Sequence, residues 1–179
     1  MLALRATLSA LLLPANALLT VPALLLWATA GDSGGLAGWL SWRWPAVLSW
    51  NSLMGGLLLG LGLGLLGWTV SLFFRRGQGT LAPWDPPRHL VTAGPYAHMR
   101  HPMISGVGLA LLGQVVLTAS PALLAWLAVF GLANGLYLPL VEEPRLARRF
   151  GDHWRDYAAH VPRWLPGTGG GSSDPDDRL

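Results

Sequence analysis

Long apolar stretches, separated by short polar or proline-rich segments, occupy the chain as far as Val141. Four of these stretches run over about residues 6–30, 47–74, 102–119 and 122–141. Crossing the apolar core of a bilayer takes about 20 residues of helix, so the pattern predicts an all-α integral membrane protein with four transmembrane helices. Ser120-Pro121 lies between the last two stretches and predicts a turn, so these two helices should form a hairpin.

The composition changes after Val141, where a charged amphipathic segment runs from Glu142 to about His160. Four apolar side chains in it recur at spacings of four, four and three, namely Leu146, Phe150, Trp154 and Tyr157. These spacings place them on one face of a helix, which Pro162 ends. We therefore expect one short C-terminal helix that forms a lid, and a disordered tail over residues 167–179, where Gly, Ser and Asp dominate.

The first apolar stretch permits a second interpretation, a cleaved signal peptide. Arg5 precedes it, and it ends in the small residues Ala28-Thr29-Ala30. The apolar part of a signal peptide is about 7–15 residues long, which is shorter than this stretch. Pro14 and Pro22 are compatible with a spanning helix, because prolines are tolerated as kinks in membranes. We therefore expect a retained membrane helix.

Glycine is concentrated in the second apolar stretch. Gly56, Gly60 and Gly64 fall four residues apart on one helical face, and such a face allows close approach of another helix in lipid. Residues 62–67 also match G-x-G-x-x-G. That motif binds dinucleotides only between a strand and a helix, and here no strand precedes it, so it does not indicate a nucleotide site.

The arginines are distributed asymmetrically about the expected spans. With the N-terminus in the cytoplasm, only Arg43 falls on the outer side, as the positive-inside rule requires. Four tryptophans between residues 39 and 50 suit an outer interfacial segment. The topology places the proline-rich loop 75–100 and the segment after Val141 on the cytoplasmic side, where they can form one site.

Composition excludes several classes of protein. Of the 179 residues, 52% are hydrophobic and 12% are charged, against about 25% charged in an average soluble domain. Cysteine is absent, which excludes disulfides, thiolate metal sites and cysteine nucleophiles. The net charge is +3, but the arginines flank apolar stretches and form no continuous basic stripe, so we expect no nucleic-acid partner.

Polar residues capable of catalysis or ligand binding lie in two parts of the chain, both on the expected cytoplasmic side. Ionisable groups at the exit of an apolar helix are costly and often functional, although headgroup anchors and helix caps are the simpler interpretation. The two groups are Arg88, His89, Tyr96, His98, Arg100 and His101 in the loop, and Glu142, Glu143 and Arg145 after the last span.

His98 and His101 have the spacing of a metal-binding H-x-x-H pair. Pro102 follows His101 directly, which argues against both histidines lying on one helix, and no thiol ligand is available. We expect no metal site. Ser105 lies near His101, but no G-x-S-x-G motif surrounds it, so a serine nucleophile is not indicated.

A series of short motifs in the second half of the chain resembles the isoprenylcysteine carboxyl methyltransferase family, and its short bacterial members most closely. That family is in turn related to the phospholipid methyltransferases. The motifs are Gly77–Thr80, Ala82–Pro87, Leu90-Val91, Gly94–Tyr96, Arg100–Met103, Glu142–Leu146, Phe150-Gly151 and Val161–Pro166.

The resemblance implies a membrane-embedded methyltransferase domain over residues 1–166, dependent on S-adenosylmethionine and without a Rossmann fold. It implies a bacterial inner-membrane protein whose active site faces the cytoplasm and whose methyl acceptor is lipophilic or membrane-associated. Carried over position by position, the cofactor-binding candidates are His89, Leu90, Val91, Tyr96, His101, Pro102, Met103 and Glu142.

The residue types at these positions suit the chemistry of methyl transfer. Arg100 or His101 can hold the cofactor carboxylate, and Glu142 can accept from its ammonium group or ribose. Methyl transfer is an in-line displacement, so positioning and water exclusion provide most of the catalysis. An amine or thiol acceptor would require a base, for which Glu143 or His101 is available. We therefore assign Arg100 and Glu143 to catalysis.

Two positions depart from the family pattern. Ile104 stands where members usually carry tyrosine, and Leu138 stands where eukaryotic members carry an arginine linked to substrate. These departures favour an alternative, a non-enzymatic four-span membrane protein that keeps the methyltransferase scaffold. Gln114 and Asn134, inside the third and fourth spans, either hydrogen-bond between helices or line the route to the acceptor.

Overall fold

The computed structural model describes residues 16–29, 49–76 and 90–164, and over these residues the chain is helical and contains no strand. The prediction of an all-α fold is therefore confirmed for the described part. The elements are η1 (Asn16–Thr20), α2 (Val21–Thr29), α4 (Trp50–Arg76), η2 (Gly94–Ala97), α5 (Pro102–Thr118), α6 (Pro121–Tyr137), η3 (Leu138–Glu142), α7 (Glu143–Phe150) and α8 (Asp152–His160).

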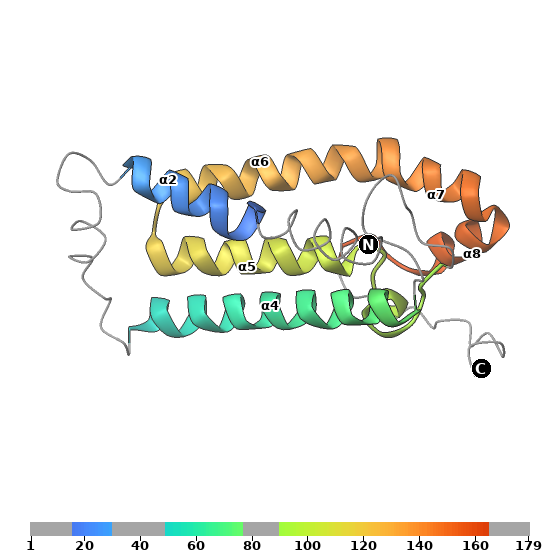
Figure 1. The fold of residues 1–179 in the computed structure, drawn as a ribbon, viewed down its shortest axis with the longest axis horizontal. Helices are drawn as coiled ribbons and strands as arrows, with labels where there is room; N and C mark the ends of the chain where they lie inside the picture. Colours follow the sequence, from blue (N-terminus) through green and yellow to red (C-terminus); the bar gives the residue numbers. More distant parts are fainter. Residues whose placement is uncertain (1–15, 30–48, 77–89, 165–179) are drawn as a thin grey trace, which may run out of the picture.

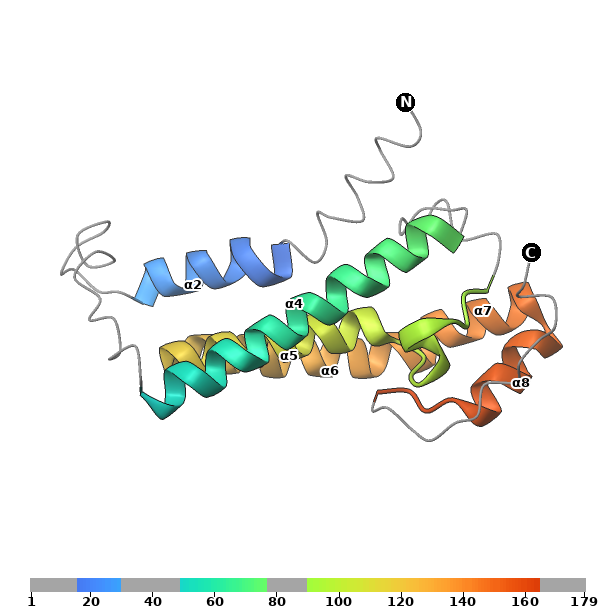
Figure 2. The ribbon, with the colours of Figure 1, turned by 90° about the horizontal axis from the view of Figure 1, so that it is seen from below.

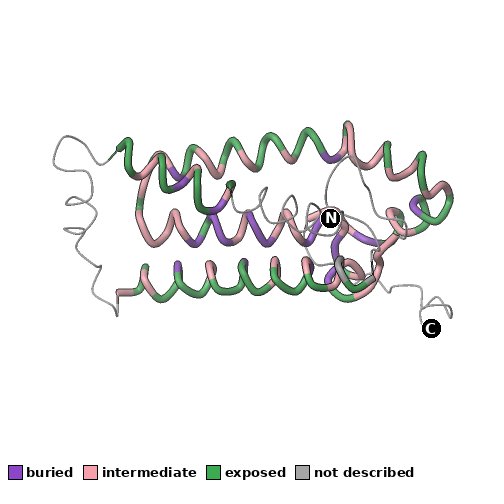
Figure 3. Tube along the Cα trace, viewed as in Figure 1, coloured by how far each residue is buried: buried purple, intermediate pink, exposed green. Residues whose placement is uncertain are grey.

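The apolar helices form an elongated bundle in which α5 lies between α4 and α6, with α2 beside α6 (Figure 1). Among the described helices α5 carries the most buried residues, whereas α4 and α6 present exposed faces outward (Figure 3). The hydrophobic core consists of Leu18, Val107, Ala110 and Leu111, and Phe130 of α6 packs against it.

Two helices of the described part are long and apolar enough to cross a membrane. They cover residues Trp50–Leu72 of α4 and the continuous helix Pro121–Phe150, and only 17% and 6% of their most apolar windows are buried. Core helices of a soluble protein would be mostly buried, so these exposures favour lipid as the surrounding medium. Asn16–Thr29 and Pro102–Thr118 are apolar but shorter, so the prediction of four spans stays a prediction.

The backbones of α4 and α5 approach each other at glycines. A Cβ atom added to Gly62 would lie 2.4 Å from the backbone nitrogen of Ala110, and one added to Gly113 would lie 2.5 Å from that of Leu59. No side chain fits at these separations, so glycine is required at both positions for close helix packing.

The prediction for the glycines of this helix was wrong about the face. A Cβ atom added to Gly56, Gly60 or Gly64 would meet no described atom of another helix within 4 Å, whereas one added to Gly55 or Gly62 would meet α5. Seven residues make about two helical turns, so Gly55 and Gly62 lie one above the other. The sequence contains both glycine sets, and only the partner helix decides which one is buried.

The turn between α5 and α6 forms as predicted. Ala119 adopts a left-handed conformation (φ 49°), and its N–H donates to the carbonyl of Val115. The Ser120 hydroxyl then accepts a hydrogen bond from the N–H of Leu123 at the start of α6, which is the usual role of serine at a helix N-cap.

Two polar side chains of the bundle satisfy backbone carbonyls that Pro22 leaves free. Because proline has no N–H, Pro22 cannot donate to Leu18 four residues earlier, nor to Ala17 five residues earlier, where a π-helical bond would end. Gln114 Nε2 donates to the Leu18 carbonyl at 2.8 Å, and Trp126 Nε1 donates to that of Ala17 at 3.0 Å. Gln114 therefore bonds between helices, while Asn134 donates to the Phe130 carbonyl of its own helix.

We expect Trp126→Phe to lower the free energy of unfolding by about 0.5–1.5 kcal/mol, because the Ala17 carbonyl loses its donor in apolar surroundings. In a Pro22→Ala background the loss should be smaller, since residue 22 then supplies a backbone N–H for this stretch. Thermal unfolding in detergent of the parent, the two single variants and the double variant forms a double-mutant cycle, which measures the coupling between Trp126 and Pro22. Trp27→Phe is the control, because Trp27 is 63% exposed; equal losses in both backgrounds would contradict the role of Pro22.

The segment after α6 forms two short helices, and the prediction of a single C-terminal helix was wrong. Gly151 has a φ of 58°, a conformation that glycine adopts readily and other residues rarely. The chain therefore breaks between α7 and α8, which meet at an angle (Figure 2). Of the four apolar side chains expected on one face, Trp154 is buried, whereas Leu146, Phe150 and Tyr157 are partly buried.

Candidate active site

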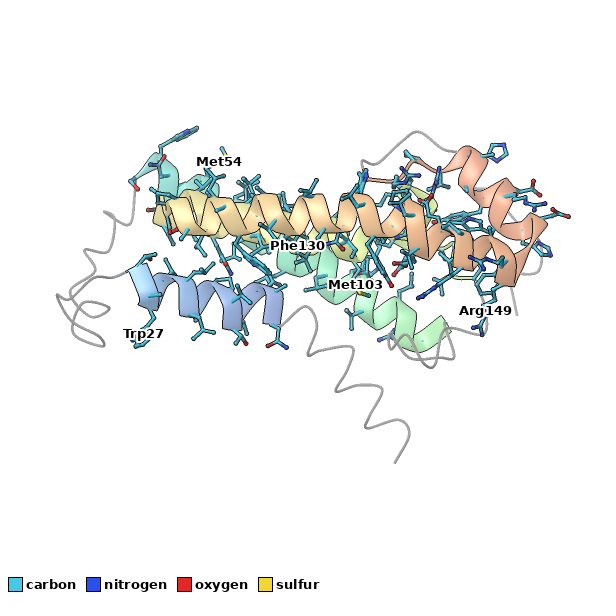
Figure 4. All side chains as sticks on the ribbon, turned by 90° about the horizontal axis from the view of Figure 1, so that it is seen from above. Trp27, Met54, Met103, Phe130 and Arg149 are labelled. Carbon is cyan, nitrogen blue, oxygen red and sulfur yellow. The ribbon has the colours of Figure 1, made fainter. Side chains whose placement is uncertain are left out.

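Three segments meet at the end of the bundle where α7 and α8 lie (Figures 1 and 2). They are the loop of residues 90–101, which contains η2, the junction of η3 and α7, and residues 161–164, which we call the C-terminal strap. The prediction that the proline-rich loop and the segment after Val141 lie together is confirmed for their described parts. Figure 4 shows polar side chains gathered at this end, while apolar side chains cover most of the remaining bundle.

The two adjacent glutamates follow a π-helical turn. The N–H of Glu143 donates to the carbonyl of Leu138, five residues earlier, and single π-helical turns are frequent at functional sites. Pro139 and Pro144 both lack the N–H that a regular helix needs, which explains the irregular turn between them. Glu142 and Glu143 thus follow a widened turn at the point where the helix changes from apolar to charged.

Glu143 is the centre of an ion-pair network. Arg163 of the C-terminal strap donates from Nε to Oε1 at 2.7 Å and from Nη2 to Oε2 at 2.8 Å. Arg100 donates from Nη1 to Oε1 at 3.2 Å. Bidentate arginine–carboxylate pairs are strong and geometrically specific, so Glu143 links α7 to the strap and to the loop before α5.

Arg100 joins the loop to the C-terminal region through its other donors. Its Nε donates to the Val161 carbonyl at 2.7 Å and its Nη2 to the Ala158 carbonyl at 2.6 Å. Its backbone N–H donates to the Pro162 carbonyl at 2.9 Å. Each guanidinium nitrogen therefore donates to a protein acceptor, which favours a positioning role for this side chain over direct contact with a ligand.

His101 precedes α5, and its side chain is only 6% exposed. Its Nδ1 lies 3.9 Å from Glu142 Oε1, and its Nε2 lies 3.5 Å from Glu143 Oε1. Both separations exceed the usual N–H···O range of about 2.7–3.2 Å, and the buried Nε2 has no hydrogen-bond partner in the described part of the chain. Such atoms are rare in folded proteins, so this one marks a position where a ligand can bind.

The charges beside His101 shift two pKa values in opposite directions. Both groups lie outside the apolar stretches, since Glu142 follows the one that ends at Val141 and His101 precedes the one that begins at Pro102. Burial raises the pKa of Glu142 and the charge of Glu143 raises it further, against the opposing effect of Arg145. Burial lowers the pKa of His101 despite the nearby Glu143 carboxylate. His101 is therefore neutral at neutral pH, and one of its ring nitrogens can accept a hydrogen bond.

Glu143 itself is held in the charged form. Burial raises its pKa, but hydrogen bonds from Arg163 and the charge of Arg100 outweigh burial, so the pKa lies below its ordinary value. The folded state thus binds this proton less tightly than the unfolded state, and the ion pairs stabilise the fold above the ordinary carboxyl pKa. This contribution is lost as pH falls through the lowered pKa.

We accordingly expect Glu143→Gln to lower the melting temperature in detergent at neutral pH, and the difference from the parent protein to narrow on acidification. Measuring both proteins across pH isolates this carboxylate from other titrating groups. Asp152→Asn, which removes an exposed ion pair with Arg155, should change the melting temperature little at any pH. A Glu143→Gln difference that stays constant with pH would contradict the assigned ion pairs.

Tyr96 is held in place by α8. The Tyr157 hydroxyl donates to the backbone carbonyl of Tyr96 at 2.7 Å, and Trp154 packs beside Tyr157 with ring centroids 5.6 Å apart. Burial raises the pKa of the Tyr96 phenol, and the charge of Glu142 raises it further, so the two side chains are electrostatically coupled. Part of the lid expected from the sequence therefore lies over η2.

The remaining predicted cofactor residues are placed as follows. Leu90 and Val91 lie half-buried in the loop before η2, Pro102 is buried at the start of α5, and Met103 is half-buried behind it. His89 lies outside the described residues, as do the tail 167–179 and the tryptophan cluster before Trp50. The structure thus brings Tyr96, His101 and Glu142 together.

A small apolar cavity of about 250 Å³ opens between α4 and η2, next to this cluster. It is lined by Leu65, Trp68, Gly94, Pro95, His98 and Met99. Gly94 has a φ of 62°, which allows the loop to turn tightly against α4. Tyr96 and His101 flank this lining in sequence, so the cavity lies along the loop that carries two of the candidate cofactor residues.

Metal and serine chemistry find no support in the geometry of the described residues. No group of three histidine or acidic side chains gathers there. His98 and His101 do not share a helix, since His98 follows η2 and His101 precedes α5. The Ser105 hydroxyl donates to the Trp164 carbonyl at 3.1 Å, which fixes the C-terminal strap.

Arg163 belongs to the motif Val161–Pro166, but the sequence alone did not indicate a role for it. The structure shows that Arg163 provides both short bonds to Glu143, and that the ring of Trp164 lies 6.2 Å from the ring of His101. The available signal was the position of an arginine in a motif that recurs with the others, but spacing alone could not indicate its partner.

A family model described as phospholipid methyltransferase matches residues 50–153, which is more than half of the chain. The chain belongs to the phospholipid methyltransferase family. This membership agrees with the resemblance found in the sequence, and it identifies the protein as a methyltransferase with a lipid-related substrate. The matched region extends from the start of α4 into α8 and contains Arg100, His101, Glu142 and Glu143. No curated protein and no solved structure matches the chain significantly.

Proposed function

We propose that the protein transfers the methyl group of S-adenosylmethionine to a lipophilic acceptor at the cytoplasmic surface of a bacterial inner membrane. The observation that carries this proposal is the buried Nε2 of His101, which has no hydrogen-bond partner in the described part of the chain, on a ring whose Nδ1 lies 3.9 Å from the carboxylate of Glu142. Polar groups of this kind at the exit of an apolar helix are costly unless a ligand uses them.

The residues fit the groups of this cofactor. The Glu142 carboxylate suits its ammonium group or ribose hydroxyls, and the neutral imidazole of His101 can hydrogen-bond to a polar group. Leu90 and Val91 offer an apolar wall for the adenine, and Tyr96 lies near enough to Glu142 to feel its charge. His89, Pro102 and Met103 complete the set that the family resemblance assigns to cofactor binding.

The cofactor supplies an electrophilic methyl group, and the protein residues position the partners and exclude water. Arg100 and Glu143 serve the reaction as positioning residues, because their donors and acceptors are engaged with each other and with the strap. Where the acceptor is an amine or thiol, His101 is better suited than Glu143 to take the proton, because two arginines hold Glu143 charged.

The acceptor is membrane-associated in this proposal. The cavity lined by Leu65, Trp68 and Met99 is apolar and lies beside the loop that carries Tyr96 and His101, so it suits an apolar chain. Leu138, at the position of the substrate-linked arginine in eukaryotic relatives, is fully buried in η3. A prenylcysteine carboxylate would find no cation there, so a different lipophilic acceptor is favoured.

The decisive experiment measures cofactor binding and product together. Calorimetry of the detergent-purified protein should show saturable binding of S-adenosylhomocysteine. Extracts of cells that express the protein should contain a methylated lipid absent from non-expressing cells. Absence of binding by a protein that melts cooperatively would move the non-enzymatic scaffold to first place.

The orientation in the membrane has its own test, because the chain lacks cysteine. A single cysteine at Ala119, in the exposed turn between α5 and α6, should react with an impermeant thiol reagent from outside intact cells. A cysteine at Asp156, exposed on α8, should react only after the cells are opened. The reverse pattern would place the site on the outer face and overturn the cytoplasmic assignment.

A further inference from the structure

Glu143 lies close to His101 and yet does not bond to it. The Oε1 atom of Glu143 is 3.5 Å from the buried Nε2 of His101, and this nitrogen has no partner in the described part of the chain. A free carboxylate at this position would take the imidazole N–H, because hydrogen bonds to a charged acceptor are stronger than neutral ones. Some feature of the structure must hold the carboxylate back.

The Glu143 carboxylate instead accepts hydrogen bonds from two arginines. Arg163 covers both oxygens, at 2.7 and 2.8 Å, and Arg100 adds a longer bond of 3.2 Å to Oε1. Among the residues that the structure describes, the Arg163 side chain has no acceptor other than Glu143, whereas the side chain of Arg100 also donates to two backbone carbonyls. Arg163 is therefore the residue whose side chain specifically fixes the position of the Glu143 carboxylate.

We propose that Arg163 is a positioning residue that draws Glu143 away from His101 and so leaves the Nε2 of His101 free for the bound ligand. This inference rests on the proposed function, because the ligand is S-adenosylmethionine there. It assigns a role in the site to the C-terminal strap, which lies outside the matched region of the family.

The contacts of the strap make the proposal testable without unfolding it. The strap is also held by the bond from the Arg100 N–H to the Pro162 carbonyl and by the bond from Ser105 to the Trp164 carbonyl. Arg163 is 37% exposed, so replacing its side chain leaves no large buried void. Arg163→Gln removes the bidentate bond, and Arg163→Lys retains the charge with a donor that cannot bridge both oxygens in the same way.

The experiment follows the His101 ring by NMR of histidine-labelled protein in detergent, with His101→Ala used for assignment. The charged groups around this ring are Glu142 of η3, Glu143 of α7, the preceding Arg100, and Arg163 of the strap. In Arg163→Gln the released carboxylate should bond to the imidazole and raise its titration midpoint. Affinity for S-adenosylhomocysteine should then fall roughly tenfold, as expected for loss of one strong hydrogen bond.

Arg163→Lys should show the same two changes to a smaller extent, and Arg155→Gln, which breaks an exposed ion pair on α8, should show neither. A loss of affinity in Arg163→Gln with an unmoved His101 titration would overturn the proposal and leave Arg163 as a clamp for the strap. A moved titration with unchanged affinity would equally overturn it. If the parent protein binds no S-adenosylhomocysteine, the proposed function fails, while the titration still decides whether Arg163 restrains Glu143.

Discussion

Replacing Glu142 by glutamine, or His101 by alanine, is expected to weaken S-adenosylhomocysteine binding by roughly 10- to 150-fold. Each change removes one hydrogen bond that involves a charged or deeply buried group, and such bonds contribute about 1.5–3 kcal/mol. The carboxylate of Glu142 and the Nε2 of His101 have no protein partner within hydrogen-bonding distance in the described residues. Their loss should therefore affect the ligand more than the fold. Isothermal titration in detergent measures the affinities.

Two exposed positions on the neighbouring helices α7 and α8 provide controls. Asp156→Asn removes an exposed carboxylate of α8, and Arg148→Ala removes an exposed arginine whose Nε donates to the Pro144 carbonyl of its own helix. Both variants should bind like the parent protein and melt at the same temperature. If Glu142→Gln and His101→Ala also bind like the parent while melting normally, the site is not where these two residues meet.

Replacing Gly62 by alanine is expected to destabilise the bundle by about 1–3 kcal/mol or more, the range for overpacking a close-packed interface. The added Cβ atom would lie 2.4 Å from the backbone nitrogen of Ala110 and 2.7 Å from the Gly106 carbonyl oxygen. Both are backbone atoms, so no side chain can rotate away, and the two helices must separate. Thermal unfolding in detergent should show a clear drop in melting temperature.

Gly60→Ala is the matched control within the same helix, because no described atom lies within 4 Å of its added Cβ. This change should be neutral or stabilising, since alanine favours helix over glycine by up to about 1 kcal/mol. Gly62→Ala is thus expected to lower the melting temperature, whereas Gly60→Ala is expected to leave it unchanged or raise it. An equal loss at both positions would show that helix propensity, rather than contact with α5, governs this region.

The sequence was sufficient to predict helices, because apolar length and proline position are local properties. It was not sufficient to predict which face of a helix meets its neighbour. Gly56, Gly60 and Gly64 fit a familiar spacing, but the packed positions are Gly55 and Gly62, which depend on the register of α5. The break at Gly151 was also missed, since the periodicity of apolar residues continues across it while the backbone does not.

The site was predictable to the extent that its residues belong to recurring motifs. Tyr96, His101 and Glu142 were found in this way, and the structure brings them together. The role of Arg163 was not found, because its partner Glu143 lies 20 residues away in sequence. The bonds of Arg100 to Val161 and Ala158 span about 60 positions, and no pattern in one sequence reports contacts at such separations.

The C-terminal strap has a consequence for where this protein can be divided. The family match ends at residue 153, yet Ala158, Val161, Pro162 and Arg163 lie beyond it and bond back to Arg100 and Glu143 inside it. The contacts that complete the ion-pair network of Glu143 thus extend past the matched region. A recombinant chain or chimaera cut at residue 153 would leave Glu143 without Arg163 and Arg100 without two of its backbone acceptors, so gene fusions should join after residue 164.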